Sequence, residues 1–161
     1  MQKITPYLWF DTQAEEAVNF YVSLFKNSRI LEITRYGENM PLPAGTVLTV
    51  SFELDGQQFV ALNGGPEFKF SEAISLFVHC ETQAEVDELW AKFTAGGEES
   101  QCGWLKDRYG LSWQIIPAGL TDLLHGPDPV KASRAVQCMF TMKKIDLAKI
   151  HAAYEGEGYD V

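Results

Sequence analysis

The sequence predicts an α+β fold in which one β-α-β-β-β module is used twice. The tetrapeptide Thr-Gln-Ala-Glu occurs at Thr12–Glu15 and again at Thr82–Glu85. Each copy follows a short apolar run and precedes an amphipathic helical pattern, and strand-like runs then follow in the same order. The paired modules are expected over 1–117, at about 3–66 and 73–117. Residues 118–161 form a C-terminal helical extension of the same domain.

The first module begins with a strand-like run, Ile4–Phe10, with Pro6 near its start. Thr12 and Glu15 have the spacing of a capping box, which predicts the start of a helix. Apolar residues then recur at helical spacing on one face. Three strands should follow, at Ile30–Tyr36, Thr46–Leu54 and Gln57–Leu62, and Asp55-Gly56 is typical of a two-residue hairpin between the last two.

The second module repeats this order. Ile74–Cys80 is strand-like, Thr82 and Glu85 form a second capping box, and a second amphipathic helix ends at Gly96-Gly97. Strands are expected around Glu98–Gln101, Gly103–Asp107 and Leu111–Ile116.

The extension after Pro117 does not repeat the module. Asp128-Pro129 predicts an N-cap with proline at the first helical position, and the helix should run to about Met142. Asp146 is expected to cap a shorter helix through Tyr154, and the tail Glu155–Val161 is expected to be mobile.

Composition limits the function classes. A chain of 161 residues with 46% apolar content can bury a core of its own. A net charge of −9 disfavours nucleic acid and anionic membrane surfaces as partners. No signal-peptide pattern and no apolar run of about 20 residues is present. Cys80, Cys102 and Cys138 are widely spaced and odd in number, which indicates reduced thiols in a cytoplasmic protein.

A set of short motifs spread between Ile4 and Tyr154 points to a family. The motifs include Leu8–Asp11, Leu62–Pro66, Gly103–Asp107 and Tyr109–Gln114. In this order they resemble the vicinal oxygen chelate superfamily of glyoxalases, bleomycin-resistance proteins and extradiol dioxygenases. The resemblance is greatest to its PhnB-like branch, often labelled 3-demethylubiquinone methyltransferase-like. It implies curled mixed sheets around a cleft, and a homodimer.

The resemblance also implies four positions at which metal-dependent members carry ligands, here near Pro6, Asn63, Ser75 and Gln114. Proline has no side-chain donor, serine is a poor ligand, and neutral amides are weak beside imidazole and carboxylate. We therefore expect no tightly bound catalytic metal and no cofactor.

A small-molecule ligand in the cleft would need apolar walls and a few polar groups. Tyr7, Trp9 and Trp104 are the expected walls, although core packing is the alternative for each tryptophan. Neighbouring strand residues point to opposite faces, so Trp113 and Gln114 cannot both line the cleft, and the family position favours Gln114. The expected ligand-binding residues are Tyr7, Trp9, Ser51, Asn63, Ser75, Trp104 and Gln114.

Three other features have a chemical and a structural interpretation. His79 is a possible metal ligand, but a strand histidine without ligand-spaced partners is the favoured alternative. Cys102 is a possible nucleophile or a small apolar residue at a strand end. Asn63-Gly64-Gly65-Pro66 does not open a helix, so it lacks the arrangement that holds adenosyl cofactors.

These observations favour metal-independent binding of a small, partly aromatic molecule. The alternative is an enzyme, either a lyase or isomerase with weak metal use through Asn63 and Gln114, or the methyltransferase of the family label.

Overall fold

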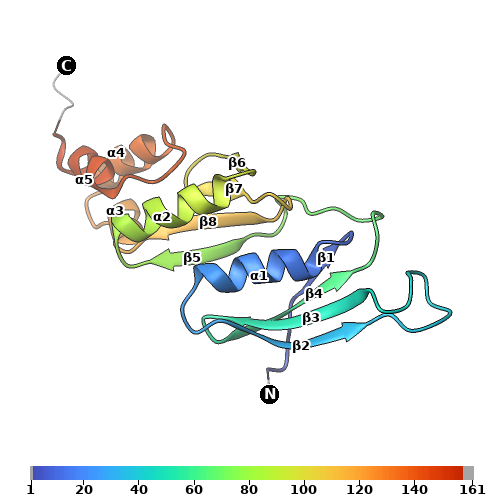
Figure 1. Ribbon diagram of the computed structural model, residues 1–161. Helices are drawn as coiled ribbons and strands as arrows, with labels where there is room; N and C mark the ends of the chain where they lie inside the picture. The colour runs from blue at the N-terminus through green and yellow to red at the C-terminus, as the bar shows by residue number, and fades with distance from the viewer. Residues whose placement is uncertain (1, 158–161) are drawn as a thin grey trace. The chain divides into compact units, whose positions relative to one another are not determined.

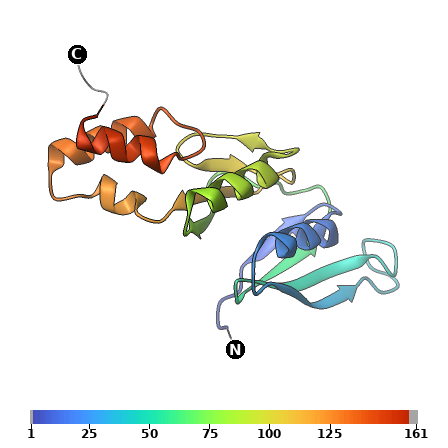
Figure 2. The ribbon, with the colours of Figure 1, turned by 60° about the vertical axis from the view of Figure 1, so that its left-hand side comes forward.

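A computed structural model of the protein describes residues 2–157 and divides the chain into two compact units, one ending at Phe70 and one beginning at Ser71. Each unit contains a four-stranded mixed sheet with a helix against one face (Figures 1 and 2). The α+β class and the duplicated β-α-β-β-β order are thereby confirmed.

The first unit consists of β1 (Tyr7–Phe10), α1 (Ala14–Leu24), β2 (Arg29–Arg35), β3 (Val47–Leu54) and β4 (Gln57–Asn63). Its strand order is β1-β4-β3-β2, with β1 parallel to β4 and the other pairs antiparallel. Asp55 and Gly56 both have positive φ, at 47° and 80°, so the predicted hairpin turn is confirmed.

Side chains alternate between the two faces of this sheet. Leu8 and Phe10 of β1 are buried, as are Val50 and Phe52 of β3, and the buried residues of α1 pack on this side. Tyr7, Trp9 and Ser51 occupy the alternate positions. They therefore belong to the face opposite α1.

The start of α1 differs from the prediction. Gln13 is the N-cap residue and makes no side-chain capping bond, so the capping box expected from Thr12 and Glu15 was wrong. Instead, the Asn63 Oδ1 atom accepts a hydrogen bond of 2.9 Å from the Ala14 N–H, and its Nδ2 donates to the Val47 carbonyl at 3.1 Å. A residue distant in sequence thus satisfies one of the first-turn amides that have no partner within the helix.

The second unit repeats the topology with β5 (Leu76–Cys80), α2 (Gln83–Thr94), β6 (Glu98–Glu99), β7 (Trp104–Lys106) and β8 (Ser112–Pro117), in strand order β5-β8-β7-β6. Here the predicted Thr82 cap is confirmed, and the Glu85 carboxylate reaches back one residue further than in a standard capping box. The Thr82 hydroxyl accepts from the Glu85 N–H at 3.2 Å, and the Glu85 carboxylate accepts from the Glu81 N–H at 2.9 Å.

The predicted strand at Glu98–Gln101 is shorter than expected because a tight turn occupies Gln101–Trp104. Cys102 and Gly103 have φ of 58° and 85°, and the Trp104 N–H donates to the Gln101 carbonyl at 3.0 Å. Two consecutive positive φ values are typical of a type I′ turn, which is favoured in hairpins.

The C-terminal extension contains α3 (Leu120–Leu124), α4 (Pro129–Met139) and α5 (Leu147–Glu155). Asp128 caps α4 by accepting from the Val130 and Lys131 N–H groups, as predicted, and Asp146 caps α5. The short helix α3 was not predicted, and α4 ends before Met142. Of the tail expected to be mobile, Glu155–Val161, Glu155 is the last residue of α5, and 158–161 lie outside the described residues.

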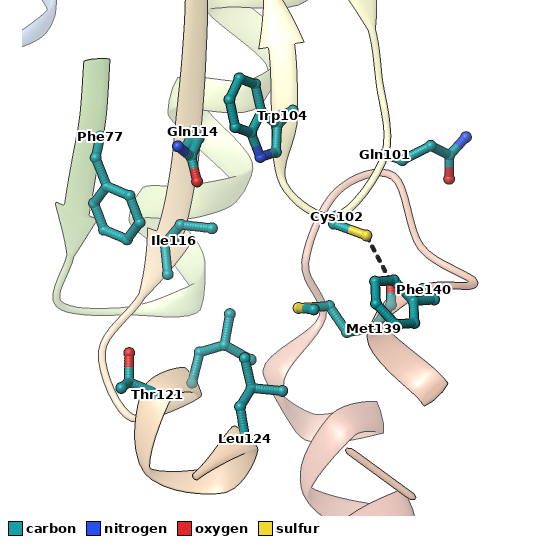
Figure 3. Close-up of a pocket in the computed structure, with 11 residues that line it drawn as sticks. Phe77, Gln101, Cys102, Trp104, Gln114, Ile116, Thr121, Leu124, Met139 and Phe140 are labelled. Atoms are coloured by element: carbon teal, nitrogen blue, oxygen red, sulfur yellow. Dashed lines mark hydrogen bonds between the residues drawn. The ribbon is translucent and has the colours of Figure 1, made fainter. Parts of the chain in front are cut away.

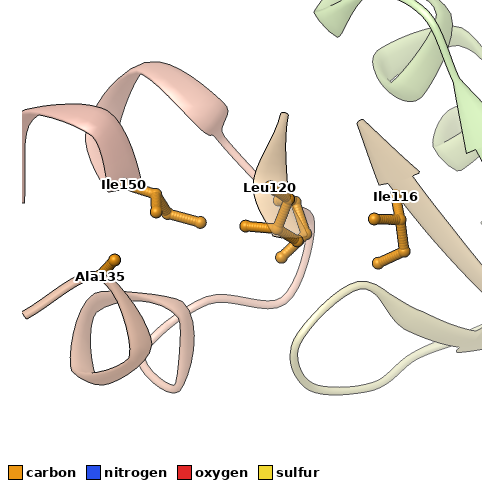
Figure 4. Close-up of a cluster of buried hydrophobic side chains, with 5 residues drawn as sticks. Ile116, Leu120, Ala135 and Ile150 are labelled. Carbon is orange, nitrogen blue, oxygen red and sulfur yellow. The ribbon is translucent and has the colours of Figure 1, made fainter. Parts of the chain in front are cut away.

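A buried cluster joins the extension to the second sheet. It comprises Ile116 of β8, Leu120 of α3, Ala135 of α4, Ile150 of α5, and Ile145 in the segment before α5 (Figure 4). The extension therefore packs as part of the second unit. Within residues 2–157, no helix combines the length and apolar character needed to cross a membrane.

The two copies of the tetrapeptide should respond differently to the same substitution. Thr82→Ala removes a real cap and should lower the free energy of unfolding by about 1 kcal/mol. Thr12→Ala is the matched control, and it should change stability by less than about 0.5 kcal/mol because Thr12 is exposed and caps nothing. Chemical denaturation of both variants measures this.

Asn63→Ala completes the comparison. It should cost about 2 kcal/mol because the Ala14 N–H and the Val47 carbonyl lose their partner in a buried position. Equal destabilisation by Thr12→Ala and Thr82→Ala would contradict this account of how α1 starts.

Candidate functional site

A pocket of about 480 Å³ lies in the second unit, on the side of the sheet away from α2 (Figure 3). The sheet contributes one wall, and α3 and the end of α4 contribute the other. The lining residues are Phe77, Gln101, Cys102, Trp104, Gln114, Ile116, Leu120, Thr121, Leu124, Met139 and Phe140.

Strand register brings three of these side chains together. Gln114 of β8 is opposite Phe77 of β5 on one side and opposite Trp104 of β7 on the other. Directly paired residues share a face, so all three project into the pocket. Trp113 projects the other way, is 2% exposed and has its ring 4.5 Å from that of Phe93 of α2. The expectation that Gln114 rather than Trp113 faces the open side is confirmed.

A buried carboxylate fixes this arrangement. Asp107 is 3% exposed, and its Oδ1 accepts from the Tyr109 N–H at 2.8 Å and the Leu111 N–H at 3.1 Å. Its Oδ2 accepts from the Trp113 indole N–H at 2.9 Å. Asp107 therefore shapes the β7–β8 turn and holds Trp113 against the helix side, which leaves Gln114 on the pocket side.

The extension is tied to α2 by one glutamine side chain. Gln83 Nε2 donates to the Ile145 carbonyl at 2.8 Å, and Gln83 Oε1 accepts from the Leu147 N–H at 3.0 Å. An exposed ion pair of 2.8 Å between Lys144 and Asp87 lies close by. These contacts fix the segment that connects α4 to α5.

The turn at Cys102-Gly103 makes a second set of contacts with this segment. The Cys102 N–H donates to the Met142 carbonyl at 2.9 Å, and the Gly103 N–H donates to the Lys143 carbonyl at 2.8 Å. A Cβ atom at Gly103 would lie 2.8 Å from Ile116 Cδ1, and φ there is 85°. Glycine is therefore needed for the turn to approach the extension.

The pocket wall contains no Asp, Glu, Lys, Arg or His. Its polar groups are amides, a hydroxyl, the Trp104 indole N–H and the Cys102 thiol. Gln114 Nε2 donates to the Ser75 hydroxyl at 2.9 Å, and Figure 3 shows Gln114 Oε1 directed into the pocket. Ser75 thus supports the amide from outside the pocket lining.

The Cys102 thiol is not activated. It contacts the Met139 carbonyl oxygen at 3.7 Å, and burial raises the pKa of this thiol above its ordinary value. Lys106, a possible activating cation in the sequence, instead pairs with Glu72. A thiol that stays protonated at neutral pH is a poor nucleophile, so the geometry favours the structural interpretation of Cys102.

The expected site residues of the first unit lie outside this pocket. Tyr7 is 64% exposed. The Trp9 indole N–H donates to the Gly65 carbonyl at 2.9 Å, and its ring lies 5.0 Å from that of Phe68 in an edge-to-face arrangement. The indole also packs so closely on Gly64 that no side chain fits there. The glycine loop therefore accommodates Trp9.

Asn63 is 5% exposed and lies on the α1 side of its sheet, so it faces away from the open side. Its amide caps α1, so Asn63 does not share a face with Trp9 and Ser51. Of the seven expected residues, Trp104 and Gln114 thus line the pocket and Ser75 supports it, whereas Tyr7, Trp9, Ser51 and Asn63 do not take part in it.

Most of the residues that line the pocket were not predicted from the sequence. Phe77 had a usable signal, since it lies two positions after Ser75 and alternation puts both on one face. Ile116 likewise lies two positions after Gln114. The residues from α3 and the end of α4 had no such signal, because only tertiary packing brings them to the sheet. The missed lining residues are Phe77, Gln101, Ile116, Leu120, Thr121, Leu124, Met139 and Phe140.

The donors at the four family ligand positions do not fit a metal. Both ends of the Asn63 amide bind main-chain groups, and Ser75 and Gln114 bind each other. His79 is exposed and has its ring 4.6 Å from that of Phe77. In the part of the chain from 2 to 157, no three His, Cys, Asp or Glu side chains gather at one point.

The raised pKa of Cys102 makes a kinetic prediction. Since the thiolate reacts and its fraction grows with pH until the pKa is passed, alkylation should be slower than that of free cysteine at pH 7. The rate should still rise about tenfold per pH unit near pH 8. Iodoacetamide kinetics in a Cys138→Ser variant isolate this thiol, because burial raises the pKa of Cys80 to about 12. A rate that reaches its plateau below pH 8 would show an activated thiol instead.

The chain is similar to a known protein family and to several solved structures. Residues 2–116 match the sequence profile of the family described as 3-demethylubiquinone-9 3-methyltransferase. No curated protein matches the chain. A solved structure from Bacillus cereus, described as a putative 3-demethylubiquinone-9 3-methyltransferase, PhnB protein, is 43% identical, with a TM-score of 0.68. The match covers 73% of this chain and 100% of that one.

More distant structures share the fold alone. A protein from Pseudomonas aeruginosa is 19% identical with a TM-score of 0.59, over 73% of this chain and 98% of its own. The fosfomycin resistance protein FosX from Listeria monocytogenes is 13% identical with a TM-score of 0.50, over 76% and 97%. With two β-α-β-β-β modules and a profile match over most of its length, the chain belongs to the PhnB-like, 3-demethylubiquinone-9 3-methyltransferase family of the vicinal oxygen chelate superfamily.

Proposed function

We propose that this protein binds a small, uncharged, partly aromatic molecule in the pocket of the second unit, without a metal. The observation that carries the proposal is the character of the wall. It combines the rings of Phe77, Trp104 and Phe140 with aliphatic side chains and includes no ionic side chain. Apolar walls with a few convergent polar groups are typical of small-molecule sites.

The size and chemistry of the pocket both support this class of ligand. A volume of about 480 Å³ is within the range of known ligand pockets. Each Å² of apolar ligand surface removed from water contributes about 25 cal/mol, which favours a ring system. A charged group placed there would find no counter-ion among the described lining residues.

The extension is part of the proposal. The family profile ends at residue 116, whereas α3 and the end of α4 supply Leu120, Thr121, Leu124, Met139 and Phe140. The family core therefore supplies the sheet wall, and the extension supplies the opposite wall. We propose that ligand binding depends on the extension remaining docked on α2.

Methyl transfer is the competing function, because the family description names it. A methyltransferase must hold a methyl donor and remove a proton from its acceptor. The described residues of the pocket wall include no carboxylate or imidazole that could accept the proton. The Gly64-Gly65 loop packs against the Trp9 indole and does not begin a helix that could hold a methyl donor. Calorimetry should show no binding of S-adenosylmethionine, and micromolar binding would favour methyl transfer over the proposal.

Binding is tested with N-phenyl-1-naphthylamine, an uncharged aromatic probe that fluoresces in apolar surroundings. We expect binding to the wild-type protein that does not change when EDTA is added. Gln83→Ala frees the α4–α5 segment and should weaken probe binding roughly fivefold or more, since two hydrogen bonds that hold the wall are lost.

Gln13→Ala is the matched control, because Gln13 has the equivalent place in the first copy and, among residues 2–157, its side chain bonds only to the Thr12 N–H. It should leave binding unchanged. A folded protein that binds no uncharged aromatic probe, or that binds one only with a divalent metal, would contradict the proposed function. The homodimer expected from the family resemblance stays a prediction, and light scattering measures it.

A further inference from the structure

We infer that the pocket selects a neutral aromatic ring that carries a hydroxyl group, held between the Gln114 carbonyl oxygen and the Trp104 indole N–H. This inference rests on the proposed function and names the ligand class more narrowly. It follows from which polar atoms face the pocket and which are already bound elsewhere.

Gln114 presents an acceptor. Its Nε2 atom donates to the Ser75 hydroxyl at 2.9 Å, so the donor end of the amide is directed away from the pocket. Its Oε1 atom points into the pocket and makes no hydrogen bond within residues 2–157 (Figure 3). Ser75 is therefore a positioning residue, because its hydroxyl holds the donor end of the amide and leaves the acceptor end to a ligand.

Trp104 presents a donor beside this acceptor. Trp104 and Gln114 are directly paired on β7 and β8 and share the pocket face, which places their side chains next to each other. An indole nitrogen only donates, and no hydrogen bond of the Trp104 N–H occurs among the described residues. In Figure 3 this nitrogen lies on the pocket side of the ring.

A hydroxyl group suits this pair because one oxygen atom both donates and accepts. It would donate to Gln114 Oε1 and accept from the Trp104 N–H. A carboxylate would instead meet the carbonyl oxygen of Gln114 with no cation in the wall, and an ammonium group would meet no carboxylate. The rings of Phe77 and Phe140 favour an aromatic body behind the hydroxyl.

Three probes of one shape test this inference: 2-naphthol, 2-methoxynaphthalene and 2-naphthoate. The methoxy compound can accept from Trp104 but cannot donate to Gln114, and the naphthoate is charged. Calorimetry with the wild-type protein should show 2-naphthol binding roughly tenfold tighter than 2-methoxynaphthalene, since the half-buried Gln114 carbonyl oxygen is left without a partner in the second case. The naphthoate should bind weakest.

Three variants assign the preference to its residues. Gln114→Met keeps the side-chain length, and it should bring 2-naphthol and 2-methoxynaphthalene to nearly equal affinity. Trp104→Phe keeps a ring but loses the N–H, and it should weaken both probes while the preference persists. Ser75→Ala should reduce the preference and Ser75→Thr should restore it, because the hydroxyl orients the amide. Circular dichroism melting curves check that each variant is folded.

The position of the probe is checked through Cys102, which lines the same pocket. Bound 2-naphthol should slow alkylation of Cys102 in the Cys138→Ser background. Equal binding of 2-naphthol and 2-methoxynaphthalene, or a preference that survives Gln114→Met, would overturn the inference and leave the proposed function standing. Failure of every neutral probe to bind the folded protein would overturn both.

Discussion

The carboxylate of Asp107 is the contact on which the candidate site depends. A buried carboxylate is costly unless its oxygens are satisfied, and here two backbone N–H groups and one indole N–H satisfy it. The backbone bonds shape the turn between β7 and β8, and the indole bond holds Trp113 on the α2 side. Because side chains alternate along a strand, fixing Trp113 also fixes Gln114 on the opposite face.

The other wall depends on main-chain hydrogen bonds rather than on apolar packing alone. The Cys102-Gly103 turn bonds to Met142 and Lys143, and Gln83 bonds to Ile145 and Leu147. Together they fix the segment after α4, and the buried cluster around Ile116 and Ile145 packs beneath it. This directional set of bonds, together with the buried cluster, holds the extension in place as the second wall.

The duplicated tetrapeptide shows how the same residues can acquire different roles. In the second unit Thr82 caps α2 and Gln83 ties down the extension. In the first unit the Asn63 amide takes over the capping of α1, and Gln13 makes only a local bond. A local sequence pattern therefore indicated where each helix begins. Which side chain accepts a hydrogen bond from the first-turn N–H groups depended on the strand end that lies nearby.

The sequence by itself determined the order of strands and helices, the hairpin at Asp55-Gly56, the cap at Thr82 and the opposite facing of Trp113 and Gln114, and the family resemblance then favoured Gln114 for the open face. All of these depend on short-range rules, namely helical spacing, the period of two along a strand and the turn chemistry of glycine and aspartate. It also identified Trp104 and Gln114 as pocket residues. Only the tertiary structure placed Asn63 under α1, packed Trp9 on Gly64 and brought α3 and Phe140 to the sheet. Those outcomes depend on contacts between residues far apart in the chain, and a short sequence pattern does not determine the free energy of such contacts.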